Sequence, residues 1–389
     1  MSLPVELYGR IAEYIRSPPI RAYWNREEDQ TLADLSLVSK TWRAEAKRAL
    51  WSTICIVSHP GDVYRLTQQF GVLLDKNYAR YVRHLVLEVG CIEHSRGYDD
   101  PVFPLKSWIE SAIPQMLSME TVLIDYVAND VRLDTLLSVY RAVYPRLNRL
   151  EVGLYFHQAF PPVGIGLDQF LLHHSRLRHS RLEVSGAGID RQRYSVPWRA
   201  LRQSCTFDRL ATFMGGLEEA KMLNSDWPVF DVQIILDDTP GVRQDRRRFF
   251  KDIMEFDGPM PRVRTLGFTY ATVPLLDLQT LDALSFTFPN LIELSGLNLS
   301  SAFVTYILNI DSQNSKSHLV DLRHLRIAGE EWDRHSFDRA TMEQTMTNLP
   351  RLFPSLHSAT FFTESPRRYL HFRFGDGGLT ISRDINIAC

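Results

Sequence analysis

The sequence lacks a run of about 18 consecutive apolar residues, the minimum for a membrane-spanning helix. It also lacks a strong excess of charge of either sign, because 44 Lys and Arg residues are balanced by 46 Asp and Glu residues. Binding to nucleic acid or to an acidic membrane through bulk charge requires a basic excess, so we expect neither partner. The first residues contain acidic side chains and no long apolar run, which does not fit a secretory signal.

Cysteine is scarce. The chain has four, and Cys55, Cys91, Cys205 and Cys389 lie far apart. Without a CxxC pair, neither a zinc ribbon nor a thioredoxin-type redox motif is available. We therefore expect reduced thiols in an intracellular protein, located in the cytoplasm, the nucleus or both.

Motifs that carry chemistry are missing as well. There is no GxxxxGK[ST] phosphate loop, no GxSxG elbow and no HExxH helix, and the GIG at 164–166 lacks a third glycine. The adjacent His173 and His174 are interpreted as a surface pair rather than a metal site. The basic stretch at 243–252 is interpreted as the solvated face of a helix rather than an RNA contact. We expect no cofactor, no metal and no enzymatic activity, although an enzyme whose site is assembled from distant loops stays open.

Apolar residues at helical spacing predict short helices in the first fifty residues. The pattern indicates a helix that ends before Ser17, a polar loop over 17–29, a second helix that begins near Thr31 or Asp34, and a third after Ser39. These helices carry more large apolar residues than they can bury among themselves. The surplus indicates either a partner site or a cap on the rest of the chain, and the spacing leaves both open.

Residues 3–51 resemble an F-box, and this resemblance covers about an eighth of the chain. The family pattern is Leu-Pro-x-Glu-Leu, an isoleucine four residues on, Asp-Leu, Val-Ser/Cys-Lys-x-Trp-Arg, and a closing Leu-Trp. The residues that match it are Leu3, Pro4, Glu6, Leu7, Ile11, Asp34, Leu35, Val38, Ser39, Lys40, Trp42, Arg43, Leu50 and Trp51. The chain departs from the family at Arg16–Gln30, where the connection between the first two helices is longer than usual.

The resemblance implies a partner and a surface that binds it. F-box domains dock onto the Skp-type adaptor of SCF (cullin-RING) ubiquitin ligases, and through it onto a cullin. The adaptor-binding residues implied here are Leu3, Pro4, Leu7, Ile11, Leu35, Val38, Trp42, Leu50 and Trp51. Some F-box proteins form adaptor complexes without ubiquitination, so a scaffold of that kind stays open.

A short phrase recurs through the remaining three hundred residues. It consists of a Pro or basic turn followed by Leu-x-x-Leu-x-apolar, as in YPRLNRLEVGLY, MPRVRTLGFTY and LVDLRHLRIAG. Its second anchor falls near residues 85, 122, 150, 182, 232, 266, 294, 325 and 359, mostly about 28 to 37 residues apart. The longer gap after residue 182 predicts a degenerate copy around 201–207, and the segments 133–144, 207–220 and 246–256 are predicted to be helical.

Strands and helices that alternate at this period resemble the leucine-rich repeat plan. The copies lack the family's regular Asn or Cys, so the array is irregular, and an ordinary α/β domain is the alternative. Residues between inward strand positions are expected on the concave surface, namely Val86, Glu151, Glu183, Gly267 and Arg326. The FGDGG at 374–378 predicts a hairpin turn.

These patterns together predict an α/β protein. Residues 1–52 form a small all-helical F-box, and residues 53–389 form about 9–10 irregular leucine-rich-like repeats. The expected function is that of a substrate receptor in an SCF ubiquitin ligase, with the repeat array binding an unidentified target protein. The layout resembles the large F-box families of fungi.

Overall fold

The computed structural model describes most of the chain, in ranges separated by short gaps. These ranges are 4–16, 26–57, 63–88, 107, 109–128, 134–156, 166–186, 191–236, 249–256, 258–269, 274–310, 317–328, 339–364, 367–375 and 378–384. The chain divides into two compact units. Unit 1 comprises Met1–Pro197 with Ser204–Phe207, and unit 2 comprises Trp198–Gln203 with Asp208–Cys389.

Unit 1 begins with the helices α1 (Val5–Ile15), α2 (Arg26–Val38) and α3 (Lys40–Leu50). The predicted end of the first helix before Ser17 is confirmed, and so is the break at Ser39, whose side chain accepts a hydrogen bond from the Trp42 backbone N–H. The predicted start of the second helix near Thr31 or Asp34 is wrong, because α2 already begins at Arg26. Its first turn contains three acidic residues, whose charge stabilises a helix N-terminus.

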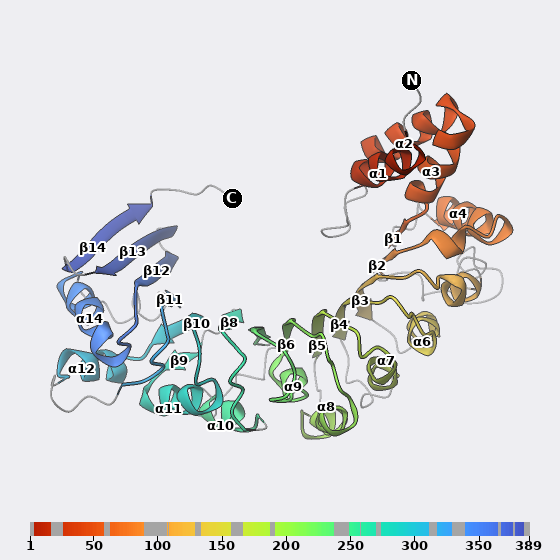
Figure 1. Cartoon of the computed structure of the whole chain (residues 1–389). Helices are drawn as coiled ribbons and strands as arrows, with labels where there is room; N and C mark the ends of the chain where they lie inside the picture. Colours follow the sequence, from red (N-terminus) through yellow and green to blue (C-terminus); the bar gives the residue numbers. More distant parts are fainter. Residues whose placement is uncertain are drawn as a thin grey trace. The chain divides into compact units, whose positions relative to one another are not determined.

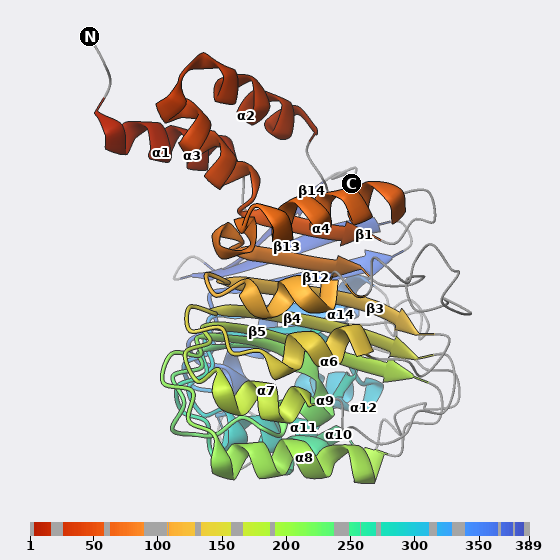
Figure 2. The same ribbon diagram turned by 90° about the vertical axis from the view of Figure 1, so that its right-hand side faces the viewer.

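The rest of unit 1 is built on five parallel strands. They are β1 (Thr53–Val57), β2 (His84–Glu88), β3 (Thr121–Ala128), β4 (Arg149–Phe156) and β5 (His179–Gly186), paired in this order. The connecting helices are α4 (Val63–Asp75), η2 (Tyr78–Tyr81), η3 (Ile113–Gln115), α6 (Asp134–Arg141) and α7 (Leu167–His173), and α8 (Arg191–Ser204) follows β5. Figure 2 shows α4, α6 and α7 along one face of these strands, whereas α1–α3 lie beyond the edge strand β1.

Register explains which residues of the repeated phrase are buried. Leu85, Val122 and Leu150 lie side by side on neighbouring strands, and all three are fully buried. The predicted anchor at Leu182 is wrong by two residues, because Ser180 pairs with Leu150 and Leu182 pairs with Val152. The phrase therefore recurs after 30 residues at this point, with a buried serine at the position of the leucine.

Unit 2 continues the alternation of strand and helix (Figure 1). Its parallel strands are β6 (Thr212–Gly216), β7 (Asp231–Ile235), β8 (Thr265–Thr269), β10 (Glu293–Leu299), β11 (His324–Ala328) and β12 (Ser358–Glu364), and the short β9 (Leu275–Leu276) pairs with β10. The helices are α9 (Leu217–Ala220), α10 (Phe249–Met254), α11 (Leu278–Thr287), α12 (Ser301–Leu308) and α14 (Arg339–Leu352). An antiparallel hairpin, β13 (Arg367–Gly375) and β14 (Gly378–Asp384), follows β12, and its pairing of Gly375 with Gly378 confirms the predicted turn.

Two sequence predictions differ from the structure at the start of unit 2. The segment 207–220 was expected to be helical but contains strand β6, and only its last four residues form α9. The degenerate copy predicted around 201–207 exists but lies further along the chain: the extra strand in this gap is β6, whereas 201–204 belong to α8. Phe213 alone of the β6 residues offers a large apolar side chain that is fully buried, and its partner across the sheet is Val232. A strand this short carries too few apolar residues for a period to be recognised.

Each strand directs alternate residues to opposite faces of the sheet. Val232 and Ile234 are fully buried on the helix side, and Asp231 and Gln233 lie on the other face. Strand pairing places Glu151, Glu183, Gly267 and Arg326 on that second face, as well as Val86. Val86 is nevertheless buried there, in an apolar cluster with its cross-strand partners Cys55 and Leu123.

The α/β class expected from the sequence is confirmed, since both units combine helices with a mostly parallel sheet. In the described ranges, no helix is both long enough and apolar enough to cross a membrane. Cys55 and Cys205 lie buried, and the other two cysteines fall outside the described residues.

Candidate partner-binding surface on the N-terminal helices

The three N-terminal helices enclose a small core of their own. Ala12, Leu32, Ala46 and Ala49 are buried in it, and Ile15, Leu35 and Leu50 are packed against it from the sides. Three of the four central residues are alanines, whose small side chains let the helix axes approach closely. On α1, only Ala12 and Ile15 take part in this core, so Leu7, Ile11 and Tyr14 are not needed to close it.

Large apolar side chains remain outside this core. On α1, Leu7, Ile11 and Tyr14 are 37%, 39% and 90% exposed, and their spacing of four and three residues puts them on one helix face. At the end of α2, Leu37 and Val38 are 75% and 67% exposed. Exposed apolar residues that cluster on short helices typically mark a surface that another protein covers.

The adaptor-binding residues inferred from the sequence separate into three groups. Pro4, Leu7, Ile11 and Val38 are exposed. Leu35 and Leu50 belong to the small core, and the half-buried Trp42 packs edge-to-face on Tyr8 with ring centroids 4.6 Å apart. Trp51 faces Tyr78 of η2 at 5.4 Å, and Leu3 lies outside the described residues.

Sequence reasoning missed two members of the exposed set. Tyr14 follows Ile11 by three residues and thus shares its helix face. Leu37 precedes Val38 at the end of α2 and is more exposed than any predicted residue of that helix. The periodicity of α1 could have identified Tyr14, whereas the exposure of Leu37 depends on how α2 packs.

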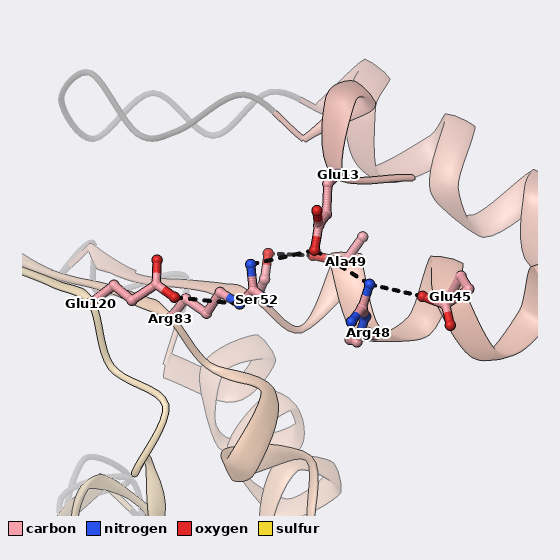
Figure 3. Close-up of polar contacts among 7 residues, drawn as sticks. All are labelled: Glu13, Glu45, Arg48, Ala49, Ser52, Arg83 and Glu120. Atoms are coloured by element: carbon pink, nitrogen blue, oxygen red, sulfur yellow. Dashed lines mark hydrogen bonds and ion pairs between the residues drawn. The ribbon is translucent and has the colours of Figure 1, made fainter. Parts of the chain in front are cut away.

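A polar network joins the helices to the first strands (Figure 3). The carboxylate of Glu13 on α1 lies 3.3 Å from a guanidinium nitrogen of Arg48 on α3 and 3.3 Å from one of Arg83, which precedes β2. The Ser52 carbonyl accepts hydrogen bonds from the backbone N–H of Arg83 and of His84, at 2.8 and 2.9 Å. The ion pairs are partly exposed, and each contributes less than about 1 kcal/mol to the contact between the helices and the start of the sheet.

The two ends of the long α1–α2 connection are also tied together. Arg16, at the end of α1, forms an ion pair with Asp29 in the first turn of α2. The same guanidinium reaches the Thr53 carbonyl at 3.5 Å. The Arg16–Gln30 insertion noted in the sequence therefore starts and finishes at one point, next to β1, and its last residues belong to α2.

An open pocket of about 350 Å³ lies between α2, α3 and the α4–η2 segment. Its walls are mostly apolar, including Leu32, Leu50 and Trp51, and Lys47 and Lys76 stand at its margin. The pocket contains no pair of facing acids and bases with which to perform proton transfer. It is a surface hollow between these helices.

Histidines in unit 1 are structural where they are buried. Burial and, to a smaller extent, the nearby guanidinium groups, Arg83 first, together lower the pKa of His84 to about 4. His173 is exposed, as expected, but the interpretation of His174 as a surface residue is wrong. The His174 ring is buried, its Nδ1 donates to the Phe170 carbonyl at 2.6 Å, and its Nε2 accepts from the Tyr144 N–H at 2.9 Å.

Among the described residues, no group of three or more His, Cys, Asp or Glu side chains is arranged to hold a metal ion. No model of a known protein family matches the sequence, and no curated protein matches it. The exposed apolar residues of α1 and α2 are therefore the feature from which we infer a function.

Proposed function

We propose that this chain is an F-box substrate receptor of an SCF ubiquitin ligase, with α1–α3 binding a Skp-type adaptor and, through it, a cullin. The observation that carries the proposal is the set of large apolar residues left outside a closed helical core. Leu7, Ile11 and Tyr14 on α1, with Leu37 and Val38 on α2, would be the anchors. The F-box pattern in the sequence supports the same assignment.

Burial of this set supplies enough free energy for a stable complex. A large apolar side chain contributes roughly 1.5–3 kcal/mol when it is fully removed from water. Leu7 and Ile11 already have part of their surface covered and contribute less than Tyr14, Leu37 and Val38. Five such anchors offset the association cost of several kcal/mol and leave a surplus that corresponds to useful affinity.

The remainder of the chain, from about residue 53 to residue 389, would be an irregular leucine-rich-repeat-like array that binds the target protein. Support comes from parallel strands that follow one another in chain order, each separated by a helix or turn. Their second sheet face carries polar and charged residues such as Glu151 and Arg326, as a protein-binding face would. Such a receptor acts by proximity, holding its target near a loaded conjugating enzyme, and requires no cofactor.

The test is binding of the purified full-length chain to a purified Skp-type adaptor, measured by isothermal titration calorimetry. Ile11→Asp and Leu37→Asp place a charge in the apolar surface and should each weaken binding at least about a hundredfold. Leu117→Asp is the matched control, because Leu117 is 60% exposed in unit 1 but lies outside α1–α3, and it should bind as the wild type does. Circular dichroism checks that all three variants fold.

Two results would refute the proposal. The first is that the folded wild-type chain does not bind the adaptor. The second is that Ile11→Asp and Leu37→Asp bind the adaptor with the affinity of the wild type. If the adaptor binds but a reconstituted cullin complex assembles without transferring ubiquitin to any co-purifying protein, the chain is instead an adaptor-bound scaffold.

A further inference from the structure

Six polar residues form a compact group on the sheet face of unit 2 that points away from the helices. They come in pairs from three adjacent strands: His324 and Arg326 from β11, Ser358 and Thr360 from β12, Arg373 and His371 from β13. Register places Ser358 between His324 and Arg373, and Thr360 between Arg326 and His371. We call this group the basic square. The intervening Leu325, Ala359 and Phe372 are buried on the helix side, which confirms the face.

Contacts inside the basic square hold the imidazoles in place. Nδ1 of His324 lies 2.9 Å from the Ser358 hydroxyl, and Nδ1 of His371 lies 3.1 Å from the Thr360 hydroxyl. When Nδ1 accepts from the hydroxyl, the ring proton is on Nε2, which can then donate to a ligand. The Ser358 hydroxyl thereby favours the tautomer in which Nε2 of His324 is a further donor on this face.

The charge of the square is positive and only partly compensated. Arg326 lies 2.9 Å from Glu293 of β10, yet its side chain remains 66% exposed. Arg373 is exposed, and no ion pair to it occurs among the described residues. The guanidinium of Arg373 can therefore bind an anion directly, and an anion could displace Glu293 from the guanidinium of Arg326.

A phosphate group suits this arrangement better than a carboxylate does. It carries up to two negative charges and three acceptor oxygens, and so it can use two guanidinium groups and imidazole N–H groups at once. A carboxylate has two oxygens in one plane and one charge, and it would leave part of the square unused.

The neighbouring surface favours an extended ligand over a free ion. The row that contains Arg326 and Thr360 continues through Ser295 of β10 and Gly267 of β8. A Cβ at Gly267 would overlap the side-chain amide of Gln233, so this glycine leaves room for the amide to lie across β8. The short polar side chain of Ser295 and the half-buried Gln233 amide, whose Nε2 donates to Asp231, leave acceptor and hydroxyl groups in this row for the backbone of a peptide.

We propose that the basic square binds a phosphorylated serine or threonine in an extended segment of a protein ligand. That this ligand is the target of a ligase rests on the function proposed above, but phosphopeptide binding itself does not. Recognition would require prior phosphorylation, because the unmodified hydroxyl carries no charge to match the two arginines.

The test uses the purified full-length chain and two fluorescein-labelled peptide pools that are identical except for a central phosphoserine. Fluorescence anisotropy should show a preference of at least about tenfold for the phosphorylated pool, and O-phosphoserine and inorganic phosphate should compete. Arg326→Gln and Arg373→Gln should each reduce binding about tenfold. Arg209→Gln removes an exposed arginine from a distant turn of the same unit and should have no effect.

Glu293→Gln gives the sharpest outcome, because it should change affinity in the opposite direction. Without the competing carboxylate, Arg326 is released to the phosphate, and binding should tighten by about threefold to tenfold. Equal binding of the two pools, unchanged binding in the arginine variants, or tighter binding of a labelled polyuridine RNA than of the phosphorylated pool would each overturn the proposal. Ile11→Asp should keep phosphopeptide binding and Arg373→Gln should keep adaptor binding, so failure of either proposal is recognised separately.

Discussion

The replacement of His174 by phenylalanine tests how a buried neutral imidazole stabilises unit 1. The wild-type ring uses both nitrogens, one as a donor to Phe170 and one as an acceptor from Tyr144. It also packs between these two aromatic residues, with ring centroids 4.0 Å from Phe170 and 5.8 Å from Tyr144. Phenylalanine preserves this packing and removes both hydrogen bonds.

The cost at neutral pH follows from the backbone group left behind. The Tyr144 N–H loses its acceptor in a buried position, and an unsatisfied buried donor costs about 1–3 kcal/mol. We therefore expect His174→Phe to lower the free energy of unfolding of unit 1 by that amount at pH 7. His173→Phe is the matched control, because His173 is the exposed neighbour and its change should cost less than about 0.5 kcal/mol.

The pH dependence gives a second, independent readout. Burial lowers the pKa of His174, an effect that its bond to the Phe170 carbonyl opposes and the His173 charge reinforces. Because the unfolded chain then binds a proton that the folded chain excludes, wild-type stability decreases as the pH falls below about 6.5 and levels off below the folded pKa. His174→Phe lacks this term, so its deficit relative to the wild type should shrink between pH 7 and pH 5.

Urea unfolding followed by circular dichroism measures the deficit, and hydrogen exchange with mass spectrometry on the 139–147 peptide localises it to unit 1. Equal stability of the two phenylalanine variants at pH 7 would refute the assigned hydrogen bonds. A deficit that stays constant from pH 7 to pH 5 would refute the neutral buried state.

Two further substitutions test the backbone geometry. Gly296→Ala should lower the free energy of unfolding in urea by about 3 kcal/mol or more, because φ at this position is +79° and the new Cβ would overlap the Phe268 carbonyl of the neighbouring strand. Gly375→Ala has open space around the new Cβ and should lower it by less than about 1 kcal/mol. Similar losses in the two variants would contradict this account. Ser39→Ala removes the acceptor for the Trp42 N–H and should lower the unfolding free energy by about 1 kcal/mol. Ser39→Asp should retain most of that stability in the same assay, and a loss as large as that of alanine would show that the hydroxyl does not act as a cap.

Local patterns in the sequence were sufficient for much of the fold. The α/β class, the helix ahead of Ser17, the break at Ser39 and the final hairpin all follow from spacing and from turn residues, which act over a few positions. The position of strand β6 and the early start of α2 were not predicted, because a five-residue strand and a polar first helical turn carry little periodic information.

The proposed surfaces depended on the sequence to different degrees. Leu7, Ile11 and Val38 were named from a motif, and their exposure agrees with a partner-binding role. Leu35 and Leu50 belong to the same motif but are packed within the helices. A motif specifies residue types, whereas exposure depends on which helix covers which side chain.

Amino-acid order alone determined the alternation of strands and helices in this chain, because hydrophobic period and turn chemistry are local properties. Packing and register decided the rest. His174 became a core residue because Tyr144, thirty residues away, presents a backbone N–H to its ring. The basic square exists because parallel and antiparallel pairing aligns His324, Ser358 and Arg373 across three strands. Neighbours across a sheet are set by long-range hydrogen bonding, and no periodicity along the chain encodes which of them will meet.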